Sequence, residues 1–97
     1  MTDRTDKRIE AFPNCGCKEI VLRTGTDVTG ATDTMTLTFA DYGLTRVYWV
    51  YMCRHSTDYS IVVEEEATST AVSGGVLTIT TLTSNDDERR VAVVCGD

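Results

Sequence analysis

Residues 45–54 constrain the fold more than any other stretch of this chain, because they form its most apolar run and contain its single Trp. β-branched and aromatic residues crowd the run without Gly or Pro, which favours a β-strand. Both alternating sets of side chains are apolar: Val47, Trp49, Tyr51 and Cys53 in one, and Tyr48, Val50 and Met52 in the other. A strand that is apolar on both faces is expected to be covered on both. We predict that the first set seals a core. The second set lies either at a subunit interface or under another segment of this chain.

The rest of the chain predicts further strands separated by polar turns. The expected strands span residues 18–24, 34–39, 45–54, 59–65, 76–82 and 89–95, with a short edge strand within 67–73 before a Gly-Gly turn. Their spacing is typical of sandwiches and barrels, and no segment has a helical period. We therefore predict an all-β fold: a small antiparallel β-sandwich or partly open barrel of about six strands, with at most a turn or two of helix.

The 97 residues predict one domain, residues 15–97, preceded by an N-terminal arm, residues 1–14. Acidic and basic side chains balance in this segment, and it has no hydrophobic period. The alternatives are a disordered terminus or an extended arm. An arm that is nearly all polar has little to hold it on its own domain, so we expect a partner chain to bind it. The candidate partner-binding residues of the arm are Arg4, Lys7, Arg8, Phe12 and Pro13.

Charge and motifs exclude several function classes. The net charge of −6 argues against a nucleic-acid partner, which needs a basic patch. No apolar run is long enough to cross a membrane, and the first residues do not resemble a signal peptide, so synthesis in a cytoplasm is expected. The single histidine, His55, follows the central strand beside Ser56 and Asp58. We predict that it is a solvated loop residue. We predict no catalytic residues and no enzyme activity.

Four cysteines, Cys15, Cys17, Cys53 and Cys95, are an even set. Structural thiols or disulfides are the first interpretation, and any bridge should join Cys15 or Cys17 to Cys53 or Cys95, because a Cys15–Cys17 ring is strained. The alternative is a zinc site with four thiolate ligands. The Cys-x-Cys spacing is a weak signal for metal, and we expect no cofactor.

Several segments carry a resemblance to a known family: residues 19–24, 31–37, 41–44 and 75–80. In their Thr-rich strands and Asp/Gly turns they resemble small structural proteins of tailed bacteriophages, in particular capsid decoration (cement) proteins. The resemblance implies a virion protein on the outer capsid surface that binds the major capsid protein and stabilises the assembled shell. It also implies a homo-oligomer, with a trimer slightly favoured over a dimer.

In that hypothesis the arm lies on a neighbouring subunit, while Tyr48, Val50 and Met52 pack in the oligomer or under the arm. Two alternatives remain open from the sequence. One is a binding module of a phage tail or fibre that recognises a glycan or another virion protein. The other is a zinc-stabilised β domain.

Overall fold

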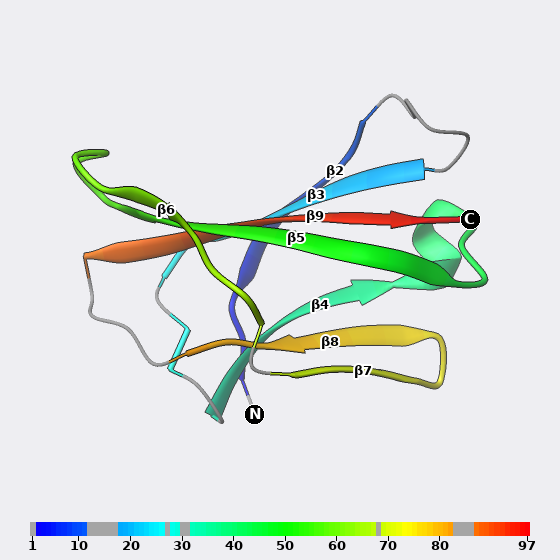
Figure 1. The fold of residues 1–97 in the computed structure, drawn as a ribbon. Helices are drawn as coiled ribbons and strands as arrows, with labels where there is room; N and C mark the ends of the chain where they lie inside the picture. The colour runs from blue at the N-terminus through cyan, green and yellow to red at the C-terminus, as the bar shows by residue number, and fades with distance from the viewer. Residues whose placement is uncertain (1, 12–17, 27, 30–31, 68, 83–86) are drawn as a thin grey trace.

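The computed structural model describes residues 2–11, 18–26, 28–29, 32–67, 69–82 and 87–97, which fold as an all-β sandwich (Figure 1). One sheet has the strand order β2 (Thr5–Ala11), β3 (Lys18–Thr24), β9 (Glu88–Gly96), β5 (Val47–Ser56) and β6 (Val62–Glu64). The other has the order β1 (Thr2–Asp3), β4 (Asp33–Thr38), β8 (Val76–Thr80) and β7 (Ser69–Ser73). Neighbouring strands are antiparallel except for β1 and β4. The predicted all-β sandwich is confirmed.

The core lies between the two sheets and is built by alternation along each strand. The five-stranded sheet supplies Ile20, Leu22, Met52, Ala92 and Val94, and the four-stranded sheet supplies Met35, Leu37, Leu77 and Ile79. All of these side chains are buried. Burial of one such side chain contributes about 1.5–3 kcal/mol, so this layer is the main source of stability in the described fold.

Two tight connections use glycine in the left-handed region of backbone space. Gly74 and Gly75 both have positive φ and join β7 to β8, as a two-residue hairpin turn requires. The 3-10 helix Phe39–Tyr42 follows β4 and ends at Gly43, whose φ is 66°. Helix content among the described residues is low, in agreement with the prediction from the sequence.

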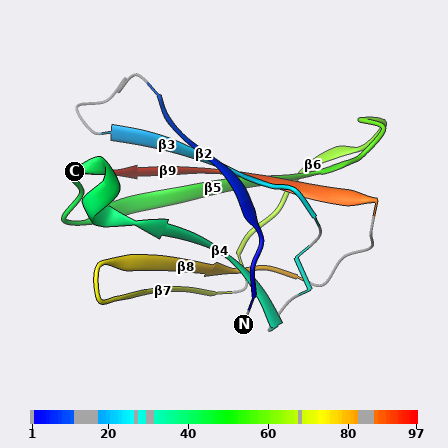
Figure 2. The ribbon, with the colours of Figure 1, turned by 180° about the vertical axis from the view of Figure 1, so that it is seen from behind.

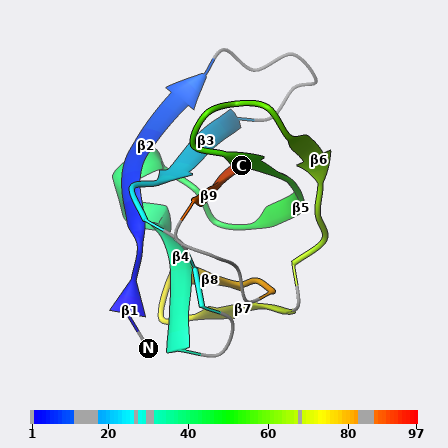
Figure 3. The ribbon, with the colours of Figure 1, turned by 90° about the vertical axis from the view of Figure 1, so that its left-hand side faces the viewer.

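The N-terminal segment is extended, as predicted, but it belongs to the sandwich. β1 adds to the edge of β4, and β2 pairs with β3, so the segment runs from one sheet to the other (Figures 2 and 3). Arg8 Nε also donates to the backbone oxygen of Thr36 at 2.8 Å. The expectation that only a partner chain can hold this polar segment is therefore wrong. Backbone pairing holds it, and pairing needs no apolar side chains.

Candidate binding groove at the open edge of the sandwich

β5 has a strand neighbour along its whole length on one side only. It pairs with β9 from Val47 to Ser56. On its other side, within the part of the chain that the structure describes, it pairs with β6 through residues 53–55 alone. Among the described residues, no strand adjoins the second edge of residues 47–52, although Glu65 N donates to Met52 O at 3.0 Å. Figure 1 shows β6 crossing β5 and the chain then turning down toward β7. The sandwich is therefore open between this half of β5 and the other sheet.

From Trp49 to Met52 the two faces of β5 are the reverse of those predicted from the sequence, whereas Val47 packs on the core as predicted. Met52 is 3% exposed and lies in the core, and Val50 packs against the core. Trp49 and Tyr51, which were expected to seal the core, point outward and are 42% and 46% exposed. The register of β5 on β9 shifts between Val47 and Trp49. This irregularity lets Val47 pack on the core as well, three residues before Val50.

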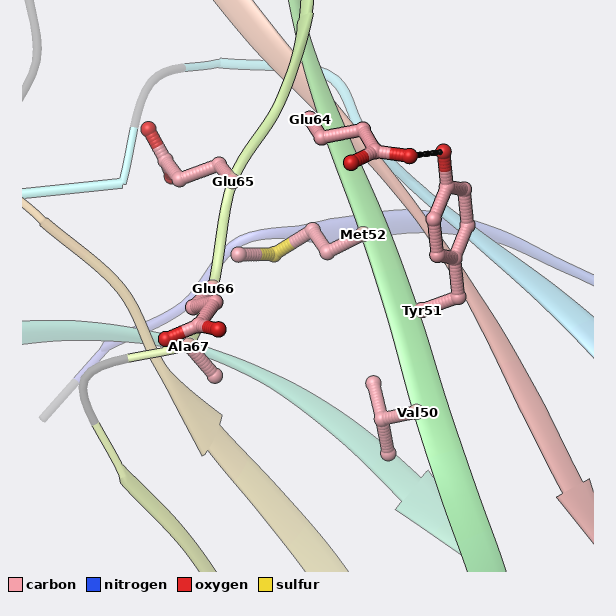
Figure 4. A pocket seen from close by; sticks show the side chains of 7 residues that line it. All are labelled: Val50, Tyr51, Met52, Glu64, Glu65, Glu66 and Ala67. Carbon is pink, nitrogen blue, oxygen red and sulfur yellow. Dashed lines mark hydrogen bonds between the residues drawn. The ribbon is translucent and has the colours of Figure 1, made fainter.

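Two adjoining cavities of about 600 Å³ and 310 Å³ form a groove along this open edge. Val50 and Ala67 line both of them. The larger cavity is also lined by Tyr51, Met52, Glu64, Glu65 and Glu66, and the smaller by Val47, Tyr48, Trp49, Thr70, Val72 and Leu77. Figure 4 shows Val50 and Met52 on β5 projecting toward the segment that carries Glu66 and Ala67. We call this site the edge groove. Its floor is apolar, and one rim is acidic.

The three consecutive glutamates of the rim have different surroundings. Glu64 accepts a hydrogen bond from Tyr51 Oη at 2.6 Å, and this bond, together with the nearby thiol of Cys53, raises the pKa of Tyr51 (Figure 4). Glu65 turns inward to Arg90, with Nε and Oε1 2.6 Å apart. Glu66 is exposed. Two carboxylates therefore remain at the solvent side of the groove, while the third anchors the segment.

Glu65 is held in place by a buried ion pair that was not predicted from the sequence. Arg90 is fully buried and donates to both carboxylate oxygens of Glu65 and to Leu82 O. Arg54 lies 3.7 Å from Glu65 and 3.1 Å from Glu88. The alternation along β9 could have predicted that Arg90 points inward, because it lies on the same face as the buried residues Ala92 and Val94. The pair fixes the wall of the edge groove to the five-stranded sheet.

The predicted partner-binding residues fall in two separate places. Tyr48, Val50 and Met52 come together at the edge groove, and Tyr48 Oη donates to Asp97 Oδ2 at 2.6 Å. Lys7 and Arg8 on β2 lie across the sheet, beyond β9 and β3.

Two of those N-terminal residues bind within the chain: Arg4 pairs with Asp33 and Arg8 pairs with Asp3. Lys7 is exposed. Phe12 and Pro13 lie outside the described residues. The structure therefore does not unite the predicted arm residues with the residues of β5.

The cysteines contradict the four-thiolate zinc site. Cys95 is buried and disulfide-bonded, and Cys53 is a free thiol. A sulfur in a disulfide is not a thiolate ligand. The described part of the chain has no group of three or more His, Cys, Asp or Glu placed to hold a metal ion. Cys15 and Cys17 lie outside the described residues.

His55 is not the solvated loop residue that the sequence suggested. It lies on β5, is 9% exposed and stacks on the ring of Tyr59 with the centroids 4.9 Å apart. Its Nδ1 is 2.8 Å from the backbone oxygen of Ser56. Ser56 Oγ instead donates to Asp58 Oδ1 at 2.6 Å. No Ser-His-Asp relay is formed by these three side chains, because neither Ser56 Oγ nor Asp58 contacts the imidazole.

Comparison with known proteins finds no matching family model, no matching curated protein and no matching solved structure. Among the described residues, no helix has the length and apolar character needed to cross a membrane.

Proposed function

We propose that this chain is a non-catalytic structural protein that binds an assembled protein surface, with the edge groove receiving an extended segment of a neighbouring subunit. The observation that carries the proposal is the open edge of β5. Residues 47–52 run beside the edge groove and have no strand neighbour on that side among the described residues.

The backbone of β5 supplies the first part of the argument. An edge strand presents unpaired N–H and C=O groups, and an extended peptide can add to it as a new strand. The neighbouring cavities, with Val50 and Met52 at their wall, provide room for every second side chain of such a peptide. Main-chain bonds then provide affinity and the cavities provide selectivity.

Charge supplies the second part. Glu64 and Glu66 keep their carboxylates at the rim of the edge groove, and the whole chain has a net charge of −6. A basic segment is attracted to such a rim, whereas an acidic one is repelled. The partner segment is therefore extended, basic at its solvent-facing positions and apolar at the positions that enter the groove.

The particular assembly that we propose is the outer surface of a tailed-bacteriophage capsid, with the major capsid protein as the partner. This step rests on the resemblance of the Thr-rich strands to capsid decoration proteins. A protein that binds only the assembled lattice stabilises that lattice by mass action.

A second candidate is a glycan-binding module of a tail or fibre. It is favoured by one observation: Tyr48 and Trp49 are exposed aromatic residues that line the smaller cavity. Aromatic faces of this kind are suited to pack on a sugar ring. Binding to a glycan array that is lost in Trp49→Ala, with no binding of peptide or shells, would favour this candidate.

Strand addition can be tested by fluorescence, because the only Trp of the chain lines the groove. A short peptide that alternates lysine and valine should shift the emission of Trp49, and a glutamate–valine peptide should not. Val50→Pro removes a backbone donor on the open edge and should abolish the shift, whereas the matched control Val50→Thr should retain it. Equal responses to both peptides, or an unchanged response in Val50→Pro, would contradict the proposal.

The capsid assignment needs a separate measurement. Assembled tailed-phage shells that lack decoration protein are mixed with the chain and sedimented. We expect co-sedimentation of the wild type and weaker binding of Glu64→Gln/Glu66→Gln. Binding of the basic peptide without binding to any shell would refute the capsid partner and leave strand addition in place.

A further inference from the structure

The outer face of the five-stranded sheet has an apolar row that crosses four strands. The register places Ile9 on β2 opposite Val21 on β3, Val21 opposite Val93 on β9, and Val93 opposite Tyr51 on β5. Ile9 and Tyr51 are 50% and 46% exposed, and both valines are partly exposed. Figure 1 shows these strands side by side, with the other sheet on the opposite face. We call these four residues the apolar row.

Charged side chains flank the apolar row on both sides along β3. Arg23 lies two residues beyond Val21, and Lys7 on β2 is directly opposite Arg23. Glu19 lies two residues before Val21. Like charges directly opposite each other destabilise a sheet unless another charge offsets them. None of the ion pairs found in the described part of the chain involves Glu19, Arg23 or Lys7. Along β2 and β3 the face is thus basic on one side of the row and acidic on the other, and at the far end of the basic side Glu64 on β6 lies opposite Cys53.

We infer that a second copy of this chain covers this face, related to the first by a two-fold axis that runs along the apolar row. Such an axis makes the two β3 strands antiparallel. It places each residue of the row against the same residue of the second copy. The residue two positions before Val21 in one copy then faces the residue two positions after Val21 in the other copy. Glu19 of each copy meets Arg23 of the other, and both ion pairs form at once, as an isologous interface requires.

Charge complementarity is the reason for choosing a second copy as the occupant. The chain is acidic overall, so association of two copies is opposed unless opposite charges meet locally. The two-fold arrangement provides that match and covers the apolar row. Packed sheets cross at about 30°. Because Glu19 and Arg23 each lie two residues from the axis along β3, this crossing displaces them relative to each other by roughly 3–4 Å. The flexible side chain of Arg23 spans this displacement. The face predicts a dimer, whereas the sequence alone favoured a trimer.

Charge reversal tests the geometry directly. Sedimentation equilibrium of the wild-type chain should give twice the mass of 10.7 kDa. Glu19→Arg and Arg23→Glu should each give monomers, because like charges then meet at both ends of the interface. An equimolar mixture of the two variants should recover a dimer, since both opposed positions again carry opposite charges. The double variant should dimerise alone.

Matched variants separate this proposal from the edge groove and from misfolding. Glu10→Arg makes the same charge change on β2 at a position that alternates with the outer face, and it should remain dimeric. Glu66→Gln, at the rim of the edge groove and outside the apolar row, should also remain dimeric. Circular dichroism checks that each variant keeps the strand signal. A monomeric or trimeric wild type, or folded single variants that stay dimeric, would overturn the inference. So would a mixture that stays monomeric.

Discussion

Arg90 Nε donates to Glu65 Oε1 at 2.6 Å, and its Nη2 lies 3.3 Å from Glu65 Oε2, so one guanidinium holds both oxygens of one carboxylate. Arg90 belongs to β9, whereas Glu65 follows β6. The pair therefore ties the connection between the sheets to the central part of the five-stranded sheet. Because Glu65 lines the edge groove, the same contact that stabilises the fold also positions the site.

Removal of one member of this pair should be strongly destabilising. Arg90→Met removes both hydrogen bonds from the buried carboxylate of Glu65 and leaves it only the longer contact to Arg54 at 3.7 Å. Loss of one member of a buried ion pair typically costs about 3–5 kcal/mol. We expect a decrease of this size in the free energy of unfolding, measured by urea titration. The double variant Glu65→Leu/Arg90→Met should regain much of the loss. Equal stability of Arg90→Met and wild type would show that the pair is not formed.

The hydrogen bond between Tyr51 and Glu64 should be visible in the titration of the phenol. The carboxylate of Glu64 accepts the phenolic proton and raises the pKa of Tyr51. Glu64→Gln should lower this pKa toward the ordinary value of about 10, as measured by ultraviolet absorbance of the tyrosinate.

Tyr48 provides the control, because Asp97 raises its pKa in the same way. Asp97→Asn should lower the pKa of Tyr48 and leave that of Tyr51 unchanged. A single common shift of both phenols in either variant would contradict the assignment of the two hydrogen bonds.

The sequence predicted the positions of the strands well, but it did not predict which side chains of the central strand point into the core. Alternation of apolar residues placed the strand at residues 18–24 as the structure has it, and placed the central strand within two residues. The faces of β5 were inverted because both alternating sets are apolar, so the pattern contains no information about which set is inward. The pairing of β2 was missed because a backbone ladder leaves no mark in side-chain hydrophobicity.

The candidate site was predictable only in part. Tyr48, Val50 and Met52 were singled out and do line the edge groove. The wall formed by Glu66 and Ala67 depends on how far β6 extends along β5, and that length is set by tertiary pairing. The predicted strand at residues 59–65 is only three residues long, Val62–Glu64. Its shortness is what leaves the edge open.

Asp58 should titrate at unusually low pH. Ser56 Oγ donates to its carboxylate, Ser60 donates through both its N–H and its hydroxyl, and these bonds lower the pKa of Asp58 to about 2. A lowered pKa in the folded state means that the stabilisation is fully present above the unfolded pKa of about 4 and is lost as the pH falls through about 2.

Carboxyl carbon chemical shifts in an NMR titration measure this midpoint. Ser56→Ala should raise the pKa of Asp58, whereas Ser73→Ala on the distant β7–β8 hairpin should not. A midpoint near the ordinary value in the wild-type chain would contradict the hydrogen-bonded turn.

Cys53 and Cys95 should differ sharply in reactivity. Cys53 is a partly exposed free thiol, so iodoacetamide should modify it in the folded chain. Cys95 should be modified only after reduction, because it is buried and disulfide-bonded. Peptide mass spectrometry distinguishes the two sites. Reduction should also lower the free energy of unfolding by about 2–4 kcal/mol. Labelling of Cys95 without a reductant would refute the bridge.

Residues 47–52 of β5, which have no strand neighbour on one edge among the described residues, are a template on which any extended chain can grow, including the unfolded form of this same protein. Glu64 and Glu66 are exposed beside that edge in every folded copy, so an incoming unfolded copy brings its own acidic run against them. Mutual repulsion slows edge-to-edge growth and keeps the chain dispersed during synthesis. Under the proposed function, the acidic rim thus sets the order of events: it disfavours a second acidic copy at the edge and leaves the edge vacant for a basic segment.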